Sequence, residues 1–197
     1  MHPSTNIQPL VAIVLCTYNG EKYLRPQLDS ILSQSWQALE IIICDDGSTD
    51  STPSILQEYQ QKDQRIRYQI NARNLGYNKN FEQAFQMAKA DYIAISDQDD
   101  IWESNKIAIM MEYWKDDSLF IFSLSGTFTD DDFKNRKPAP DVNYTPIRHL
   151  QQLVFNSPVH GHACIFRKEL LAHCIPFPDD IYYDWWMSMH AARLSVI

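Results

Sequence analysis

The segment IAISDQDDIW, residues 93–102, runs from a short apolar strand directly into three carboxylates and then a tryptophan. Asp97, Asp99 and Asp100 are so close in sequence that their charges repel one another unless a cation neutralises them. Hard carboxylate oxygens on one or two side chains hold Mg²⁺ or Mn²⁺ in proteins, while phosphates of a ligand complete the coordination. The segment therefore predicts a divalent metal bound against a diphosphate. The alternative is an acidic turn that caps the next helix, for which one Asp would suffice.

The composition indicates one globular domain with an acidic surface. The chain has 197 residues, 45% of them hydrophobic, and a formal net charge of −8. This length suffices for one buried α/β core, and the negative charge argues against a nucleic-acid partner. No apolar run approaches the roughly 20 residues of a transmembrane helix, and the N-terminus lacks signal-peptide features, so a cytoplasmic location is expected. The four cysteines show no CxxC pair and are expected to be reduced, mostly buried thiols.

Strand and helix patterns alternate along the chain. Buried strands are expected at 11–16, 40–44, 65–70 and 92–96, and helices at 21–33, from 51, at 77–88 and at 103–115. Then follow an apolar run at 119–124, a polar loop at 129–146, helices at 147–155, 168–173 and 184–194, and a strand at 159–166. This alternation predicts an α/β fold, with a mostly parallel sheet, right-handed crossovers and flanking helices.

Polar loops follow the first, second and fourth expected strands. They contain residues 17–19, 45–48 and 97–100. Because the carboxyl ends of parallel strands meet at one edge of a sheet, these loops are expected to line one crevice. The proline-containing stretch 138–146 is the candidate boundary within this single domain, and the shift in composition predicts one ligand-binding half at 1–126 and a second at 127–197.

Five motifs stand in order between Val11 and the end of the chain. They are VAIVLCTYNGEKYLRPQLDSILSQSW, EIIICDDGSTDST, RNLGYNKNFEQAF, DYIAISDQDDIW and YYDWW. Together they resemble family-two glycosyltransferases of the GT-A fold, especially the bacterial rhamnosyltransferase-like branch that assembles cell-surface polysaccharide. The resemblance implies a Rossmann-like αβα sandwich. It also implies more chain beyond the DWW helix, so a truncated C-terminus is expected.

The activity that this resemblance implies is transfer of a sugar, with inversion, from a dTDP- or UDP-sugar donor. The implied acceptor is a saccharide or a lipid-linked saccharide, and the implied cofactor is Mg²⁺ or Mn²⁺. Peripheral association with the inner face of the cell membrane is compatible with this activity. The sequence leaves the sugar, the nucleotide base, the acceptor and the oligomeric state open.

The resemblance also implies roles for individual residues. Asp99 and Asp97 would bind the metal, and Asp97 could instead contact the ribose. For Asp45 and Asp46 the alternative is a turn and helix cap; for Arg73 it is a solvated surface charge. Asp100 would orient its neighbours or cap the next helix. The implied donor-binding residues are Thr17, Asn19, Glu21, Asp45, Asp46, Arg73 and Asp97.

On the acceptor side, Asp184 is the candidate base for the acceptor hydroxyl, with a helix N-cap as the alternative role. The implied acceptor-binding residues are Trp102, His160, Trp185 and Trp186. For Trp102 the alternative is a core anchor of the following helix, and one of the adjacent tryptophans Trp185 and Trp186 is expected in the core.

Three rival interpretations remain for comparison. His160, His162 and Cys164 alternate along the expected strand at 159–166, which would suit zinc, although the spacing matches no recognised zinc motif. A dehydrogenase is excluded because CTYNGE, and no GxGxxG, follows the first strand. A non-catalytic module that binds a nucleotide-sugar or a polysaccharide is the stronger alternative to an enzyme.

Overall fold

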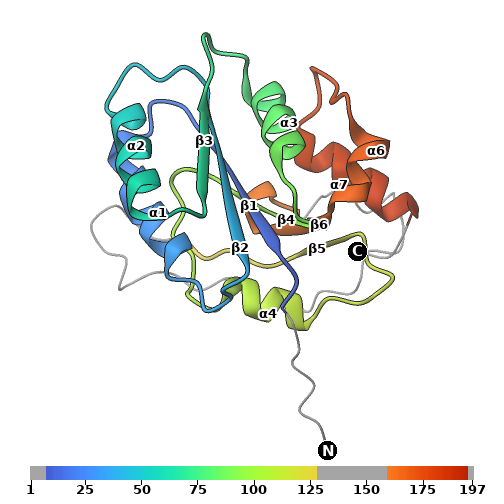
Figure 1. The fold of residues 1–197 in the computed structure, drawn as a ribbon. Helices are drawn as coiled ribbons and strands as arrows, with labels where there is room; N and C mark the ends of the chain where they lie inside the picture. The colour runs from blue at the N-terminus through green and yellow to red at the C-terminus, as the bar shows by residue number, and fades with distance from the viewer. Residues whose placement is uncertain (1–7, 128–158, 195–197) are drawn as a thin grey trace, which may run out of the picture.

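The structure is a computed structural model that describes residues 8–127 and 159–194 (Figure 1). The expected loop at 129–146 and the expected helix at 147–155 lie outside the described residues. None of the described helices is long and apolar enough to cross a membrane.

A six-stranded sheet forms the centre of the described fold, in the order β3-β2-β1-β4-β6-β5. Strand β1 pairs in parallel with β2 and β4, and β2 with β3, whereas β6 runs antiparallel to both of its neighbours. The mostly parallel sheet that the sequence predicts is therefore confirmed. The strands are β1 Val11–Thr17, β2 Leu39–Asp45, β3 Ile66–Ile70, β4 Tyr92–Ser96, β5 Phe120–Phe122 and β6 Cys164–Arg167.

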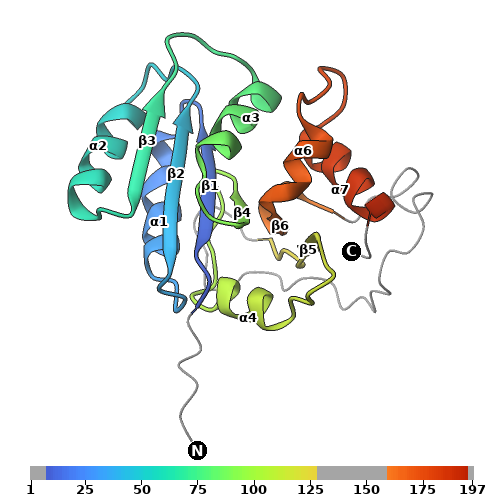
Figure 2. The ribbon, with the colours of Figure 1, turned by 45° about the vertical axis from the view of Figure 1, so that its right-hand side comes forward.

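Helices cover both faces of this sheet, which gives the three-layer sandwich that the sequence predicts (Figures 1 and 2). Helices α1, α2 and α4 pack in one core cluster, and α3, α6 and α7 pack in the other. The helices are α1 Glu21–Leu32, α2 Thr52–Lys62, α3 Tyr77–Met87, α4 Lys106–Glu112, α6 Leu171–Cys174 and α7 Tyr183–Leu194, with short 3₁₀ turns at Gly161–Ala163 and Lys168–Leu170.

The continuous apolar run of β1 reflects burial on both faces of the strand. Val14 belongs to the cluster under α3, while Ile13 and Leu15 belong to the cluster under α1, and all three are fully buried. Burying each such side chain contributes about 1.5–3 kcal/mol. The strand order reverses between β1 and β4, which makes this position the topological switch point of the sheet. Open α/β sheets bind their ligands at such a point, outside the carboxyl ends of the strands.

Three expected elements differ from the structure. The helix expected at 168–173 is a 3₁₀ turn over Lys168–Leu170 and continues as α6 from Leu171. The helix expected at 103–115 begins only at Lys106, because the main-chain oxygens of Glu103 and Ser104 accept hydrogen bonds from Gln34 and Ser35, at the end of α1. The strand expected at 159–166 was wrong over its first half, since Gly161–Ala163 is a 3₁₀ turn and β6 begins at Cys164.

Candidate functional site

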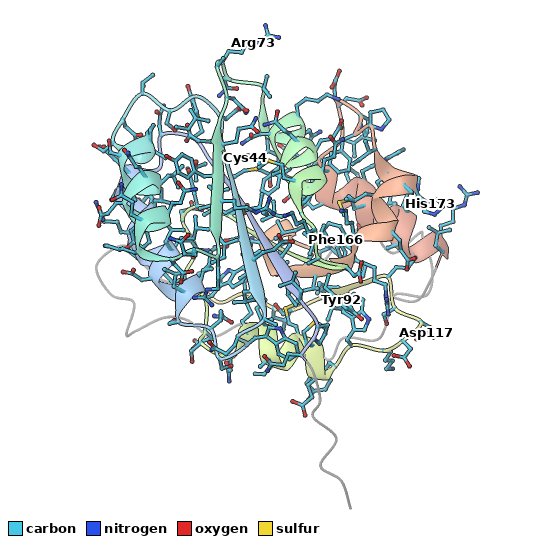
Figure 3. All side chains as sticks on the ribbon, in the orientation of Figure 1. Cys44, Arg73, Tyr92, Asp117, Phe166 and His173 are labelled. Carbon is cyan, nitrogen blue, oxygen red and sulfur yellow. The ribbon has the colours of Figure 1, made fainter. Side chains whose placement is uncertain are left out.

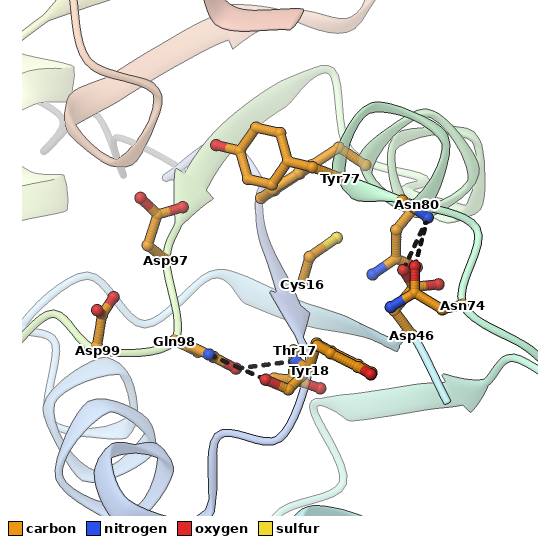
Figure 4. Close-up of a pocket in the computed structure, with 12 residues that line it drawn as sticks. Cys16, Thr17, Tyr18, Asp46, Asn74, Tyr77, Asn80, Asp97, Gln98 and Asp99 are labelled. Atoms are coloured by element: carbon orange, nitrogen blue, oxygen red, sulfur yellow. Dashed lines mark hydrogen bonds between the residues drawn. The ribbon is translucent and has the colours of Figure 1, made fainter. Parts of the chain in front are cut away.

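A cavity of about 330 Å³ opens at the carboxyl ends of β1, β2 and β4, where the sequence predicts a crevice (Figure 4). This volume lies in the usual range for small-molecule sites. The start of α3 closes the cavity from the side opposite Asp97. The lining residues are Cys16, Thr17, Tyr18, Asp46, Asn74, Gly76, Tyr77, Asn80, Phe81, Asp97, Gln98 and Asp99.

Asp45 is fully buried and holds the turn after β2. Its Oδ1 accepts hydrogen bonds from the Thr17 hydroxyl at 2.7 Å and the Ser48 hydroxyl at 2.6 Å, and its Oδ2 accepts the Ser48 N–H at 2.9 Å. These three donors satisfy the hydrogen-bonding capacity of a carboxylate that is buried away from water. Asp45 therefore acts as the turn residue of the alternative interpretation, and it does not line the cavity.

The neighbouring carboxylate of Asp46 faces the cavity, with its side chain almost fully buried. Its Oδ1 accepts the Leu75 N–H at 2.8 Å and the Asn71 amide at 3.0 Å, and its Oδ2 accepts the Gly76 N–H at 3.0 Å. These bonds fix the loop between β3 and α3 against the end of β2. An oxygen of Asp46 is thereby held rigidly at the cavity wall.

Asn19 and Glu21 join the loops after β1 and β2. Asn19 adopts a left-handed φ of 49° and its Oδ1 accepts the Thr49 N–H at 2.9 Å, while Glu21 accepts the Ser51 N–H at 2.8 Å. Asn is among the few residues that tolerate this backbone conformation. Neither side chain lines the cavity.

Arg73 lies exposed at the tip of the loop between β3 and α3, and its side chain points away from the molecule (Figure 3). It does not line the cavity, although its neighbour Asn74 does. The position matches the solvated surface charge of the alternative interpretation.

The acidic segment after β4 meets residues that precede β6. In the antiparallel pairing, Ala94 lies opposite Ile165, so continuing that register past the strand ends brings Asp97 opposite His162. His162 Nδ1 lies 3.5 Å from Asp97 Oδ2. One ligand atom each from Asp97, Asp100 and His162 lie within 4.8 Å of one another. Sequence reasoning did not predict this group, because its two parts are far apart in the chain.

The donor set of this group fits a divalent cation. Asp100 Oδ2 is buried and has no hydrogen-bond partner among the described residues. Burial raises the pKa of Asp100, and the hydrogen bond with Asp97 raises the pKa of His162. Asp99 lines the cavity as an exposed side chain and lies outside this group.

Lys106 and Trp102 follow the acidic segment in the chain and pack against each other. Lys106 Nζ donates to the His162 carbonyl at 2.7 Å and lies 3.9 Å from the Trp102 ring centroid, and burial lowers the Lys106 pKa to about 8. Trp102 is 5% exposed and packs in the core cluster under α1. This position matches the core anchor of the alternative interpretation.

Asp184 lies at the start of α7, next to the 3₁₀ turn that precedes β6. Its Oδ2 accepts the Gly161 N–H at 3.0 Å and its Oδ1 the Trp185 N–H at 2.8 Å. Burial raises the pKa of Asp184, and the charge of Asp97 adds to this shift. Burial raises the pKa of Tyr77, on the cavity wall, and the charges of Asp97 and Asp184 add to this shift. Asp184 follows Tyr183, whose ring centroid lies 5.2 Å from that of the cavity-lining Tyr77.

The other expected acceptor residues have different surroundings. Trp186 Nε1 donates to the Cys174 carbonyl at 2.9 Å, and its ring packs against the core, so Trp186 is the core member of the pair. Trp185 is half-buried. His160 is exposed and its ring stacks on that of His162, with centroids 5.7 Å apart.

The zinc set of His160, His162 and Cys164 is not brought together as one face, because Gly161–Ala163 is a turn. Cys164 is buried, donates its thiol to the His160 carbonyl, and has a pKa raised well above the ordinary value by burial. All four cysteines are free, and Cys44, Cys164 and Cys174 are buried, as the sequence predicts.

The described sheet, its switch point and the cavity have the layout of an open α/β fold that binds its ligand at the carboxyl ends of the strands. The family model described as Glycosyl transferase family 2 matches residues 12–175, and the chain belongs to this family. The resemblance stated from the sequence motifs is thereby confirmed, although nothing singles out the rhamnosyltransferase-like branch.

Curated relatives cover the chain well, but the chain spans only about half to two thirds of their length. An uncharacterized glycosyltransferase of Haemophilus influenzae is 29% identical over 203 residues, which cover 96% of this chain and 62% of the relative. UDP-Glc:alpha-D-GlcNAc-diphosphoundecaprenol beta-1,3-glucosyltransferase WfaP of Escherichia coli is 35% identical over 138 residues, 68% of this chain and 54% of the relative.

Solved structures share the fold. TarS 1-349 of S. aureus in complex with UDP-GlcNAc superposes with a TM-score of 0.73 at 22% identity, over 93% of this chain and 53% of that one. Mannosyltransferase PcManGT of Pyrobaculum calidifontis, in complex with GDP-Man and Mn²⁺, superposes with a TM-score of 0.68 at 19% identity, over 92% of this chain and 51% of that one. The GT-A fold that the motifs imply is confirmed.

Proposed function

We propose that the protein transfers a sugar, with inversion, from a dTDP- or UDP-sugar to a saccharide acceptor in cell-surface polysaccharide synthesis. One observation carries the proposal. A cavity at the sheet's switch point has a rigid carboxylate, Asp46, on one wall and an acidic rim at Asp97 and Asp99. A half-buried carboxylate, Asp184, follows Tyr183, whose ring packs against that of the cavity-lining Tyr77. A nucleoside diphosphate needs such a cavity, and an inverting transfer needs such a base.

The donor is proposed to occupy the half formed by residues 1–126. Asp46 would accept a hydrogen bond from the base or ribose, and Thr17 would line the pocket beneath it. Asn19, Glu21 and Asp45 would then serve the donor indirectly, by holding the loops that carry these residues. Arg73 would reach donor phosphate only from outside the cavity wall.

Asp97 and Asp99 are proposed to face a divalent cation, Mg²⁺ or Mn²⁺. Bound there, the cation would neutralise the donor diphosphate and stabilise the departing nucleoside diphosphate. The Mn²⁺ in the related mannosyltransferase structure supports a metal of this kind.

The acceptor is proposed to approach through the half formed by residues 127–197. Asp184 would take the proton of the acceptor hydroxyl, for which a pKa raised by burial suits a general base better than an ordinary Asp. Gly161 and the α7 N-terminus hold this carboxylate in place. Trp185 and the exposed ring of His160 would contact the sugar.

A lipid-linked saccharide at the inner face of the cell membrane is the proposed natural acceptor. The glucosyltransferase WfaP supports it, because its name specifies a diphosphoundecaprenol-linked sugar. The proposed location is therefore cytoplasmic, with peripheral association at the membrane.

A thermal-shift screen of UDP-, dTDP- and GDP-sugars, each with Mn²⁺, Mg²⁺ or EDTA, tests donor binding, because a ligand that binds only the folded state raises the melting temperature. We expect a metal-dependent shift with a UDP- or dTDP-sugar. Transfer to a saccharide acceptor, followed by NMR of the product anomer, then tests the reaction. Donor binding without transfer or donor hydrolysis would instead support the non-catalytic module, and no shift with any donor would contradict both.

A further inference from the structure

We propose that His162 is a direct ligand of the divalent cation, that it completes a ligand set with Asp97 and Asp100, and that it gives the site a preference for Mn²⁺ over Mg²⁺. The inference rests on the proposed function, since it concerns the metal that this activity would use. In this proposal, the carboxylates that follow β4 are joined by a nitrogen ligand from the 3₁₀ turn that precedes β6.

The geometry of the group suits a cation. A metal with ligand atoms at about 2.1 Å holds adjacent ligand atoms about 3 Å apart and opposite ones about 4.2 Å apart. His162 Nδ1 and Asp97 Oδ2 are 3.5 Å apart, and the ligand atoms of the whole set lie within 4.8 Å of one another. Small side-chain rotations bring such a set onto one ion.

Asp100 provides an independent sign of a ligand. Its Oδ2 is buried and accepts no hydrogen bond from any described residue. Leaving a buried acceptor unsatisfied costs about 1–3 kcal/mol, and more for a charged group. A cation bound between Asp97 and Asp100 satisfies this oxygen.

The His162 ring is held as metal ligands usually are. Its Nε2 lies 2.8 Å from the Ser125 hydroxyl, which can accept the Nε2 proton. A ligating histidine typically donates its other ring N–H to such a partner, which fixes the tautomer. The Nδ1 lone pair is then free to face the carboxylates, and Lys106 fixes the main chain of His162 through its carbonyl.

The nitrogen ligand sets the metal preference. Mg²⁺ favours an all-oxygen shell with several waters, whereas imidazole suits the transition metals. An Asp–Asp–His set therefore discriminates against Mg²⁺ more strongly than carboxylates alone. Asp99, exposed on the cavity side, remains available to face the cation from the cavity.

The test uses the 197-residue chain with Mn²⁺ alone and no nucleotide. Pulsed EPR of bound Mn²⁺ detects the magnetic coupling of a directly coordinated imidazole nitrogen. We expect a ¹⁴N coupling that changes to a ¹⁵N coupling when histidine is ¹⁵N-labelled. This labelling needs no variant, so the result does not depend on how a substitution folds.

Substitution then identifies the histidine. His162→Asn should remove the nitrogen coupling and weaken Mn²⁺ binding by at least about tenfold, since even indirect partners of a ligand contribute 10- to 100-fold. Mg²⁺ affinity should fall less. His160→Asn, which changes the ring stacked on His162, and His173→Asn, on the exposed surface of α6 (Figure 3), should keep the coupling.

Bound Mn²⁺ without nitrogen coupling would overturn the proposal, as would a coupling that survives in His162→Asn or an absence of Mn²⁺ binding. An ion pair between His162 and Asp97 without a metal role predicts the first of these results. The outcome is separable from that of the proposed function. Carboxylate-only Mn²⁺ binding with sugar transfer refutes the His162 ligand alone, and nitrogen-coupled Mn²⁺ without donor binding refutes the transferase alone.

Discussion

Replacing Asp45 and, separately, Asp46 with Asn distinguishes a carboxylate that serves the fold from one that also serves the ligand. Both side chains are buried, and each accepts three hydrogen bonds. An amide keeps one acceptor oxygen and turns an NH₂ group toward a donor. At Asp46 the NH₂ group would face either the two donors on Oδ1 or the Gly76 N–H, which also donates to Asn74 Oδ1. At Asp45 it would face either the Ser48 N–H or the two hydroxyls.

The expected loss of stability follows from this exchange. A buried donor left without an acceptor costs about 1–3 kcal/mol. For a chain of this size each kcal/mol lowers the melting temperature by roughly 2–4 °C. Both variants should therefore melt about 2–12 °C below the parent, with no ligand present.

Nucleotide affinity should separate the two variants, because Asp46 lines the cavity and Asp45 does not. A hydrogen bond to a charged group contributes about 1.5–3 kcal/mol, so Asp46→Asn should weaken UDP or dTDP binding by roughly 10- to 100-fold. Asp45→Asn should bind within about threefold of the parent, provided that it is folded at the assay temperature.

Differential scanning fluorimetry gives the melting temperatures, and calorimetry with UDP and dTDP in the presence of Mn²⁺ gives the affinities. Asp179→Asn is the control, since the Asp179 side chain is 91% exposed. Equal affinity losses at positions 45 and 46, or parental binding by Asp46→Asn, would refute the assignment of the donor wall. An unchanged melting temperature of Asp45→Asn would refute the turn argument.

Three further predictions address the base, its support and the metal. Asp184→Asn should keep donor affinity but lower transfer about 10²- to 10⁴-fold, and transfer at the parental rate would exclude the role of Asp184 as the base. Because burial raises the Asp184 pKa and a base acts when deprotonated, the transfer rate of the parent should rise with pH through a midpoint above the ordinary Asp pKa of about 3.9. Gly161→Ala should lower the free energy of unfolding, measured by thermal melting, by about 1–3 kcal/mol, since the new Cβ would lie 2.6 Å from the buried Tyr183 hydroxyl. Gly20→Ala should lower it less, because its Cβ meets only the movable Gln98 amide, and equal losses in the two variants would contradict this packing. EDTA should weaken nucleoside diphosphate binding measured by calorimetry, and equal affinity with EDTA and with Mn²⁺ removes the metal from the proposal.

The strand and helix boundaries near the cavity could be predicted from the sequence because both faces of the sheet are covered. Strand β4 begins and ends at the expected residues, Tyr92 and Ser96, since the polar segment that follows cannot be buried without partners. The same reasoning could not place Trp102. A tryptophan after a strand suits either a sugar or the core, and its placement in the core cluster with α1, with Lys106 over its ring, follows only from the tertiary packing.

The carboxylate pair after β2 shows a second limit of sequence reasoning. Asp45 and Asp46 are adjacent and chemically identical, so composition and spacing predict the same role for both. Their directions differ because successive residues at a strand end point to opposite sides. Asp45 turns toward Thr17 and Ser48, while Asp46 turns toward α3 and the cavity.

The group of Asp97, Asp100 and His162 depends on the direction of one strand. Had β6 run parallel to β4, its preceding residues would lie at the opposite edge of the sheet, away from the acidic segment. The antiparallel register instead places the residues before β6 directly beside those after β4. The alternation of His160, His162 and Cys164 therefore does not reveal the neighbours of His162, because Asp97 and Asp100 follow β4, far from His162 in the chain.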